Sequence, residues 1–153
     1  MKILAVRRPW PYLIDGNHKT IEVRSTPTGF RGYLGLYNSL SKPDPDEYDY
    51  FRYELGFDVS VDDLVFGEIT SLIEIKDCIK LDTLEIFMSY QLEHCLDVRH
   101  FRPGLYGWVI GDVIPLPRTV PFKMPKGCVI FANVPDELIL DTGVVIPDVP
   151  ATT

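Results

Sequence analysis

Apolar and polar positions alternate in the stretch GNHKTIEVRS near the amino terminus. Its polar residues Thr20, Glu22 and Arg24 share one parity. Its apolar residues Ile21 and Val23 share the other, which is the period-2 pattern of a strand with one buried face. We therefore expect the apolar pair to face the core and the polar face to meet water, with or without a ligand.

Similar runs of β-branched and aromatic residues, bounded by proline and glycine, predict further strands. They cover residues 2–7, 32–39, 64–81, 105–116 and 125–134. We expect a bulge at Gly67 in the strand over 64–81. We also expect Pro115 and Pro117 to end the strand that starts at residue 105.

Three segments instead show helical signals. A short helix is predicted over 9–16, with prolines in its first turn and Gly16 as its cap. An acidic helix is predicted over 42–55, stopped by Gly56, and a third over 81–98 from its 3.6-residue apolar period.

These elements do not alternate regularly, which disfavours a doubly wound parallel sheet. They predict an α+β fold built on a small, mostly antiparallel β-barrel with flanking and inserted helices. We expect one domain over residues 1–135 and a proline-rich carboxy-terminal extension over 136–153, which wraps the surface or frays.

Composition narrows the class of protein. The chain has 153 residues, of which 46% are apolar and 24% charged, as in ordinary globular domains. No apolar run reaches the length of a membrane span, and the basic residues follow the first apolar run, against the order of a signal peptide. We expect a cytoplasmic protein that does not bind a membrane.

Cysteines and histidines offer no recognisable metal spacing. Cys78, Cys95 and Cys128 lie outside any CxxC pattern and are expected to be buried, reduced thiols. The three histidines form no triad or ligand spacing and are expected at the surface: His18, His94 and His100. No metal and no cofactor is predicted.

Charge is distributed unevenly along the chain. The formal net charge is −7, yet residues 1–32 hold six bases against two acids, a net +4. Residues 44–100 hold fifteen acids against four bases, a net −11. An acidic protein attracts long polyanions poorly, but a local basic cluster suits a few phosphates or one nucleotide.

The candidate chemistry lies in that basic segment, where Arg7, Arg8 and Trp10 precede the polar strand. Lysine and arginine donors suit a phosphate or a carbonyl on which negative charge develops. Glutamate accepts from the exocyclic amine of a base or moves a proton, and tryptophan offers a stacking face. The alternative is purely structural: a solvated strand face, a turn lysine at Lys19, and core aromatics at Trp10 and Trp108.

Several short motifs in the same order resemble an ASCH domain of the PUA-like superfamily. The first two are a PW pair and the pattern KT(I/V)ExR(S), here Pro9-Trp10 and residues 19–25. The others are RGxL at 31–34, FGEI at 66–69 and YGWVxxDV at 106–113. The stretch PFKMPKGCVIFANVP at 121–135 resembles the family's closing strand with its PxKG pattern. The resemblance spans roughly residues 1–135.

The resemblance implies a PUA-like barrel with a cleft for RNA or another nucleic acid, and no metal or cofactor. Lys19, Glu22 and Arg24 match the polar residues that face this cleft, and Thr20 and Ser25 lie in the same motif. Arg8 and Arg31 would add charge at its rim, and Trp10 would line it. We predict these eight residues as the site.

Some bacterial ASCH members are amidohydrolases that remove the acetyl group of N(4)-acetylcytidine with a lysine, a threonine and a glutamate. This chain keeps Lys19 but has Glu22 at the threonine position, and Thr20 lies one pleat repeat away. A few members are ribonucleases, in which a lysine, a carboxylate and an arginine could act as acid, base and phosphate clamp.

Three functions remain open from the sequence. The first is binding of single-stranded RNA or a modified nucleotide, and it predicts that the acidic segment 44–63 lies away from the cleft. The second is hydrolysis of RNA or an acylated cytidine, with Lys19 stabilising the oxyanion or donating a proton and Glu22 as general base. The third is a protein-interaction or regulatory domain that uses the acidic segment. The oligomeric state is not determined.

Overall fold

The computed structural model describes residues 1–127 and 131–148. Within them it contains a mixed β-sheet and several short helices, which confirms the α+β class. The strands are β1 (Lys2–Val6), β2 (Ile21–Arg24), β3 (Gly32–Asn38), β4 (Glu68–Leu81), β5 (Leu105–Pro121) and β6 (Phe131–Asn133). The α-helices are α1 (Trp10–Asp15), α2 (Pro45–Asp49), α3 (Leu84–Ser89), α4 (Gln91–His94) and α5 (Asp136–Leu140).

The sheet has the strand order β2-β5-β4-β3-β1-β6. β1 runs parallel to β3, and the other neighbouring strands pair antiparallel. Between the described residues of β6 and β2 no pairing closes the sheet into a barrel. The predicted last strand includes residues 128–130, which lie outside the described part of the chain.

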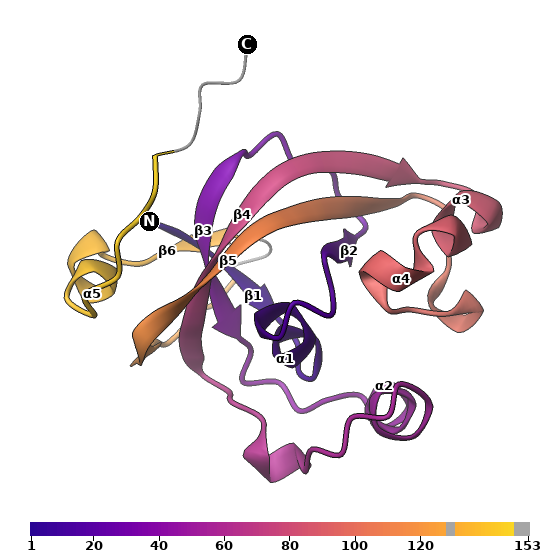
Figure 1. Ribbon diagram of the computed structural model, residues 1–153, viewed down its shortest axis with the longest axis horizontal. Coiled ribbons are helices and arrows are strands. Elements are labelled where there is room, and N and C mark those ends of the chain that lie inside the picture. Colours follow the sequence, from indigo (N-terminus) through magenta and orange to yellow (C-terminus); the bar gives the residue numbers. More distant parts are fainter. Residues whose placement is uncertain (128–130, 149–153) are drawn as a thin grey trace.

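Helix α1 lies beneath the long curved strands β4 and β5, with α2 beyond it and α3 and α4 near one end of those strands (Figure 1). Its first turn begins with Trp10 and Pro11. At its end the amide of Gly16 donates to the carbonyls of Tyr12 and Ile14. Trp10, Leu13 and Ile14 are buried, so the helix is held by packing against the sheet rather than by its length.

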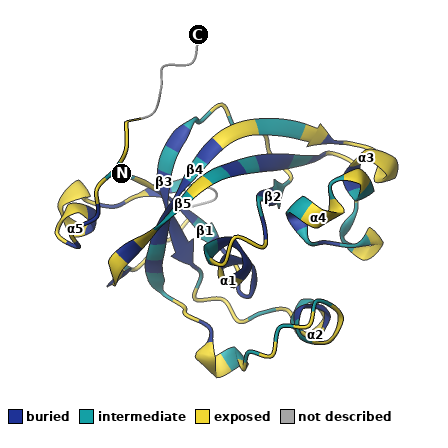
Figure 2. Cartoon of the chain, in the orientation of Figure 1, coloured by how far each residue is buried: buried dark blue, intermediate teal, exposed yellow. Residues whose placement is uncertain are grey.

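Two groups of buried side chains make up the core (Figure 2). The larger lies between the sheet and α1 to α4 and includes Leu34, Phe51 and Trp108. The smaller lies on the other side of the sheet and includes Ile3 and Ile139. The sheet is therefore buried on both faces over much of its area.

The helical predictions need two corrections. The segment 81–98 forms two short helices, because the chain leaves the helix at Tyr90 and turns through a left-handed residue at Cys95. The acidic segment continues from α2 into a π-helical turn (Tyr50–Glu54), and a 3-10 turn (Val61–Asp63) follows. Gly56, with φ of 84°, allows the chain to turn after it.

The strand predictions also need correction at proline and glycine. Gly67 precedes β4 rather than forming a bulge within it, and the register instead shifts elsewhere along β4 and β5. β5 runs through both prolines to Pro121. Pro117 is tolerated because it falls between the partners of Ser71 and Ile69, where the ladder is irregular.

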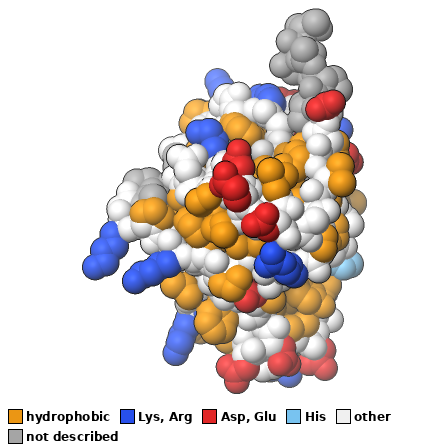
Figure 3. Space-filling model, turned by 90° about the vertical axis from the view of Figure 1, so that its left-hand side faces the viewer, with side chains coloured by type: hydrophobic (Ala, Val, Ile, Leu, Met, Phe, Trp, Pro, Cys, Tyr) orange, Lys and Arg blue, Asp and Glu red, His pale blue; other side chains and the backbone are white. Residues whose placement is uncertain are grey.

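The segment after residue 135 packs on the sheet in its described part. The amino group of Met1 binds Asp136, and Ile139 and Val144 are buried in the smaller core group. The face on the α5 side carries apolar, acidic and basic side chains next to one another (Figure 3). None of the described helices is long and apolar enough to cross a membrane. The domain boundary at residue 135 remains a prediction.

His94 is fully buried, so the expectation that the histidines lie at the surface is wrong for it. Its Nδ1 accepts from the Leu96 amide at 2.9 Å, and its Nε2 lies 2.7 Å from the Phe87 carbonyl. These bonds assign the proton of a neutral imidazole to Nε2. Burial lowers the pKa of His94 to about 4.

His94 should make stability depend on pH. Its folded pKa of about 4 lies below the ordinary 6.5, so the unfolded chain binds the proton first as the pH falls. Between pH 7 and pH 5 this costs about 2 kcal/mol of unfolding free energy. Urea unfolding at the two pH values should show that loss in the wild type and less of it in His94→Gln. Equal losses in both proteins would contradict this prediction.

Candidate functional site

A recess of about 450 Å³ lies where β1, β2, α1 and the acidic segment meet. Its wall includes the ends of β1 and β2, Trp10 of α1 and Glu47 of α2. The charged side chains that line it are Arg7, Glu22, Arg24, Glu47 and Arg102. Residues from β1, α1, β2 and α2, together with Arg102, therefore contribute to one small, polar recess.

Glu22 is the best-buried of these charges, with 6% of its surface exposed. Its Oε2 accepts a hydrogen bond of 3.0 Å from Nε of Arg24, and its Oε1 lies 3.9 Å from Nζ of Lys19. The alternation predicted that the polar face of β2 meets water, but Glu22 on this face is buried. The carboxylate is buried between two cations, which offset part of its desolvation cost.

Lys19 lies behind this wall rather than in it. Only 2% of its surface is exposed, and Nζ donates to the carbonyl of His94 at 2.6 Å. The ammonium also lies 5.3 Å from the centre of the Trp10 ring, a cation–π contact. Burial lowers the pKa of Lys19, and the Glu22 carboxylate partly opposes that shift.

Arg24 connects Glu22 to β1, a strand that does not pair with β2 in the sheet. Its Nη2 donates to the carbonyl of Ala5 at 2.7 Å, and its guanidinium lies 5.9 Å from the centre of the Trp108 ring. Trp108 is fully buried and donates through Nε1 to the Thr26 carbonyl at 2.9 Å. Among the described residues no partner binds Nη1 of Arg24, so this nitrogen can donate to a guest.

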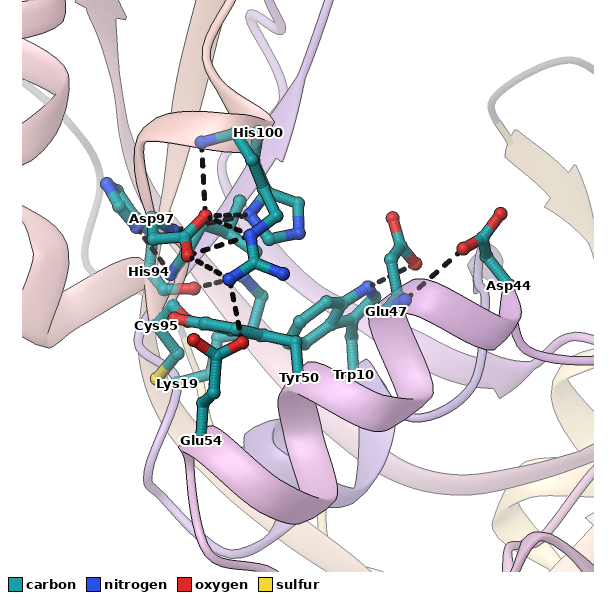
Figure 4. Close-up of polar contacts among 12 residues, drawn as sticks. Trp10, Lys19, Asp44, Glu47, Tyr50, Glu54, His94, Cys95, Asp97 and His100 are labelled. Carbon is teal, nitrogen blue, oxygen red and sulfur yellow. Dashed lines mark hydrogen bonds and ion pairs between the residues drawn. The ribbon is translucent and has the colours of Figure 1, made fainter.

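Trp10 is mostly enclosed, with 8% of its surface exposed. Lys19 occupies a ring face, and the indole Nε1 donates to Oε2 of Glu47 at 3.2 Å (Figure 4). The side chain of Asp44 in turn accepts from the Glu47 amide at 3.2 Å. The indole therefore ties α1 to α2 and offers a guest a patch of apolar wall instead of a free stacking surface.

The outer part of the recess is basic. Arg7 and Arg102 are exposed, and neither forms an ion pair within the described part of the chain. With Arg24 they place three guanidinium groups around the opening, against the carboxylates of Glu22 and Glu47. The expectation that the acidic segment lies away from this site is wrong at Glu47.

Besides Lys19, four of the predicted site residues do not line this recess. Arg8 turns away and donates to the carbonyls of Leu40 and Ser41. Arg31 forms an ion pair with Asp77 at 3.6 Å. The remaining two are Thr20, which is partly buried, and Ser25, which is exposed beyond β2.

Arg102 and Glu47 were not predicted from the sequence as site residues, and Arg8 was predicted for the rim in place of Arg7. Arg7 follows the buried Val6 at the end of β1, so strand parity favours it as the exposed position. The only sequence signal for Arg102 was its position in a short basic run, RHFR, within an acidic region. Nothing in the spacing of Glu47 indicates a contact with Trp10, 37 residues earlier.

The arrangement suits recognition of a small polar guest. It provides acceptors on Glu22 and Glu47 and planar donors on three arginines, which bind phosphate or carbonyl oxygens in pairs. In the part of the chain that the structure describes, no group of three or more His, Cys, Asp or Glu side chains could hold a metal ion. Cys78 and Cys95 are free and only partly buried, and Cys128 is not among the described residues.

Comparison of the sequence with protein-family models and with curated proteins finds no match. The fold, however, is similar to crystal structures of the ASCH protein from Zymomonas mobilis. One aligns with a TM-score of 0.60 and 11% identity over 92% of this chain and 91% of that chain.

Two mutants of the same protein align as well. A tyrosine-to-phenylalanine mutant has a TM-score of 0.61 and 10% identity, covering 95% of this chain and 98% of that chain. A serine-to-alanine mutant has a TM-score of 0.60 and 11% identity, covering 92% of each chain. At such low identity the likeness concerns the fold. The chain has an ASCH-like fold, as the order of its motifs predicted.

Proposed function

We propose that the recess between β1, β2, α1 and α2 binds one nucleotide, either a free modified nucleotide or a unit of a single-stranded RNA. The observation that carries this proposal is the position of Glu22 within the wall. Its carboxylate is held by Arg24 and lies beside Lys19, and it can accept from the exocyclic amine of a base. Nη1 of Arg24, which has no partner among residues 1–127 and 131–148, can donate to the adjacent carbonyl or phosphate.

Arg7 and Arg102 support the assignment of the phosphate to the outer part of the recess. Both are exposed and free of ion pairs with described residues, so binding a phosphate requires no existing bond to be broken. The recess of about 450 Å³ falls in the size range of small-molecule sites. Glu47 and the net −11 of residues 44–100 disfavour a long polyanion, so we assign a single unit.

A carboxylate acceptor should discriminate between bases. Cytidine and adenosine monophosphates carry an exocyclic amine, and uridine monophosphate does not. In isothermal titration calorimetry at low salt, we expect cytidine or adenosine monophosphate to bind about tenfold more tightly than uridine monophosphate. Arg102→Ala should weaken all of them by a similar factor, because its phosphate contact does not depend on the base.

The matched control is Arg118→Ala, an exposed arginine that donates to the Asp141 carbonyl and does not line the recess. It should bind as the wild type does. Absence of binding by every monophosphate and by short single-stranded RNA at low salt would contradict the proposed function. Equal binding of cytidine, adenosine and uridine monophosphates would contradict the role given to Glu22.

Glu47 should limit the affinity for phosphate-rich ligands. Glu47→Gln keeps an acceptor for Nε1 of Trp10 and removes one negative charge from the wall. We expect a severalfold gain in affinity for a nucleoside diphosphate and a smaller gain for the monophosphate. The gain should shrink at high salt. A salt-independent change, or a loss of affinity, would show that Glu47 acts by shape and not by charge.

Hydrolysis of an acylated cytidine or of RNA is the second candidate function. The supporting observation is the carboxylate of Glu22 in the recess wall beside Lys19, an amine whose pKa is lowered by burial. Such a pair suits proton transfer. Direct action by Lys19 would require it to leave the His94 carbonyl and pass Trp10.

Lys19→Met separates the two candidates. If the protein is a hydrolase, this substitution should abolish turnover of acetylated cytidine or labelled RNA above the no-enzyme rate while thermal unfolding remains cooperative. A binding protein should give the same background rate with and without the substitution. Turnover by the wild type that Lys19→Met leaves unchanged would exclude Lys19 as a catalytic residue.

A further inference from the structure

A second recess of about 410 Å³ lies on the other side of α1, away from Glu22 and Arg24. Tyr12 and Asp15 of α1 line it, three residues apart and therefore on one face of the helix. The facing wall comes from Asn38 at the end of β3 and from residues 63–65 before β4. Arg8, predicted for the nucleotide site, lines this recess instead.

A chain of hydrogen bonds lies beneath this recess, in which Asn38 donates to Thr70 and Thr70 donates to Asp15. The Nδ2 amide of Asn38 donates to the Glu68 carbonyl at 3.3 Å and to Oγ1 of Thr70 at 3.0 Å. Thr70 Oγ1 then donates to Oδ2 of Asp15 at 2.7 Å. The donors of Asn38 and Thr70 are thereby used within the protein, and the acceptors remain.

The remaining acceptors make the recess a site for hydrogen-bond donors. Oδ1 of Asp15 is buried and has no hydrogen-bond partner among the described residues. It lies on a carboxylate whose terminal torsion is soft, so a small rotation turns it toward a guest. The amide oxygen of Asn38, a residue only 4% exposed, also has no partner within the described chain. Asp63 adds a second carboxylate at the edge.

Arg8 does not cancel this preference for donors. Its Nε and Nη2 donate to the carbonyls of Leu40 and Ser41, and its guanidinium lies 4.7 Å from the centre of the Phe66 ring. Two of the three guanidinium nitrogens of Arg8 therefore already donate to backbone carbonyls of Leu40 and Ser41. Burial raises the pKa of Asp15, and the hydroxyl groups of Ser71 and Thr70 partly oppose that shift.

The rest of the wall is apolar. Tyr12 is 44% exposed and Val65 is 39% exposed, and both line the recess together with the buried Leu64. An aromatic face and aliphatic side chains around a carboxylate suit an organic cation, because the ring attracts the charge and the aliphatic groups bury its apolar part.

We propose that this second recess binds a small ligand with a protonated amine on an apolar body. The ammonium lies against Asp15 and the amide oxygen of Asn38. The apolar body lies against Tyr12, Leu64 and Val65. The site is separate from the proposed nucleotide site, and α1 forms part of both walls.

The test uses benzylamine as a probe and benzyl alcohol as its uncharged match, in ¹H–¹⁵N correlation spectra of the labelled protein. Benzylamine should produce saturable shifts of the backbone amides of Asp15, Asn38 and Val65. Benzyl alcohol should bind about tenfold more weakly, since it lacks the charge-assisted bond to the carboxylate. The absence of saturable shifts with benzylamine, or equal binding of the alcohol, would overturn the proposal.

Asp15→Asn should weaken benzylamine binding about tenfold while keeping an oxygen for Thr70, and the exposed Asp82→Asn should leave binding unchanged. Val65→Ser removes apolar wall without touching the charge and should weaken binding severalfold. Arg102→Ala, which removes an exposed arginine of the first recess, should bind benzylamine as the wild type does, so failure of the nucleotide site does not imply failure here. Wild-type affinity in both Asp15→Asn and Val65→Ser would overturn the proposal.

Discussion

The buried carboxylate of Glu22, held between Arg24 and Lys19, is the constraint on which the architecture of the site depends. A charge out of contact with water is costly unless it is paired. Lys19 reaches the carboxylate from the turn after α1, and it also donates to His94 at the end of α4. Arg24 reaches it along β2 and also binds the Ala5 carbonyl of β1. One carboxylate thereby links three neighbouring segments of the amino-terminal region to α4, where His94 lies 75 residues after Lys19.

Helix α1 gives the molecule two distinct surfaces. Trp10 faces the nucleotide-sized recess and binds Glu47, whereas Tyr12 and Asp15 face the second recess. The helix has only six residues, so its position is set by burial of Leu13 and Ile14 beneath the sheet. A guest in either recess would contact the same rigid element, although the polar groups it meets are different.

The local charge at the recess differs in sign from the net charge of the protein. The net charge of −7 and the acidic middle of the chain disfavour long-range attraction of nucleic acid. Arg7, Arg24 and Arg102 nevertheless gather at one opening, where short-range bidentate bonds matter more than the distant field. This combination is consistent with a small anionic ligand and with discrimination by hydrogen bonding.

The α+β class, the order of the strands along the chain, and the shared face of Glu22 and Arg24 could all be predicted from the amino-acid sequence. This was possible because strand parity and turn residues are local properties. The burial of Glu22 on this face became visible only in three dimensions, because Lys19, Arg24 and the wall formed with Trp10 and Glu47 surround it. The recess is lined by Arg7 and not by the predicted Arg8, and Glu47 and Arg102 also line it, which the sequence did not predict. Parity states which side of a strand a residue takes, but what covers that side depends on contacts between residues far apart in the chain.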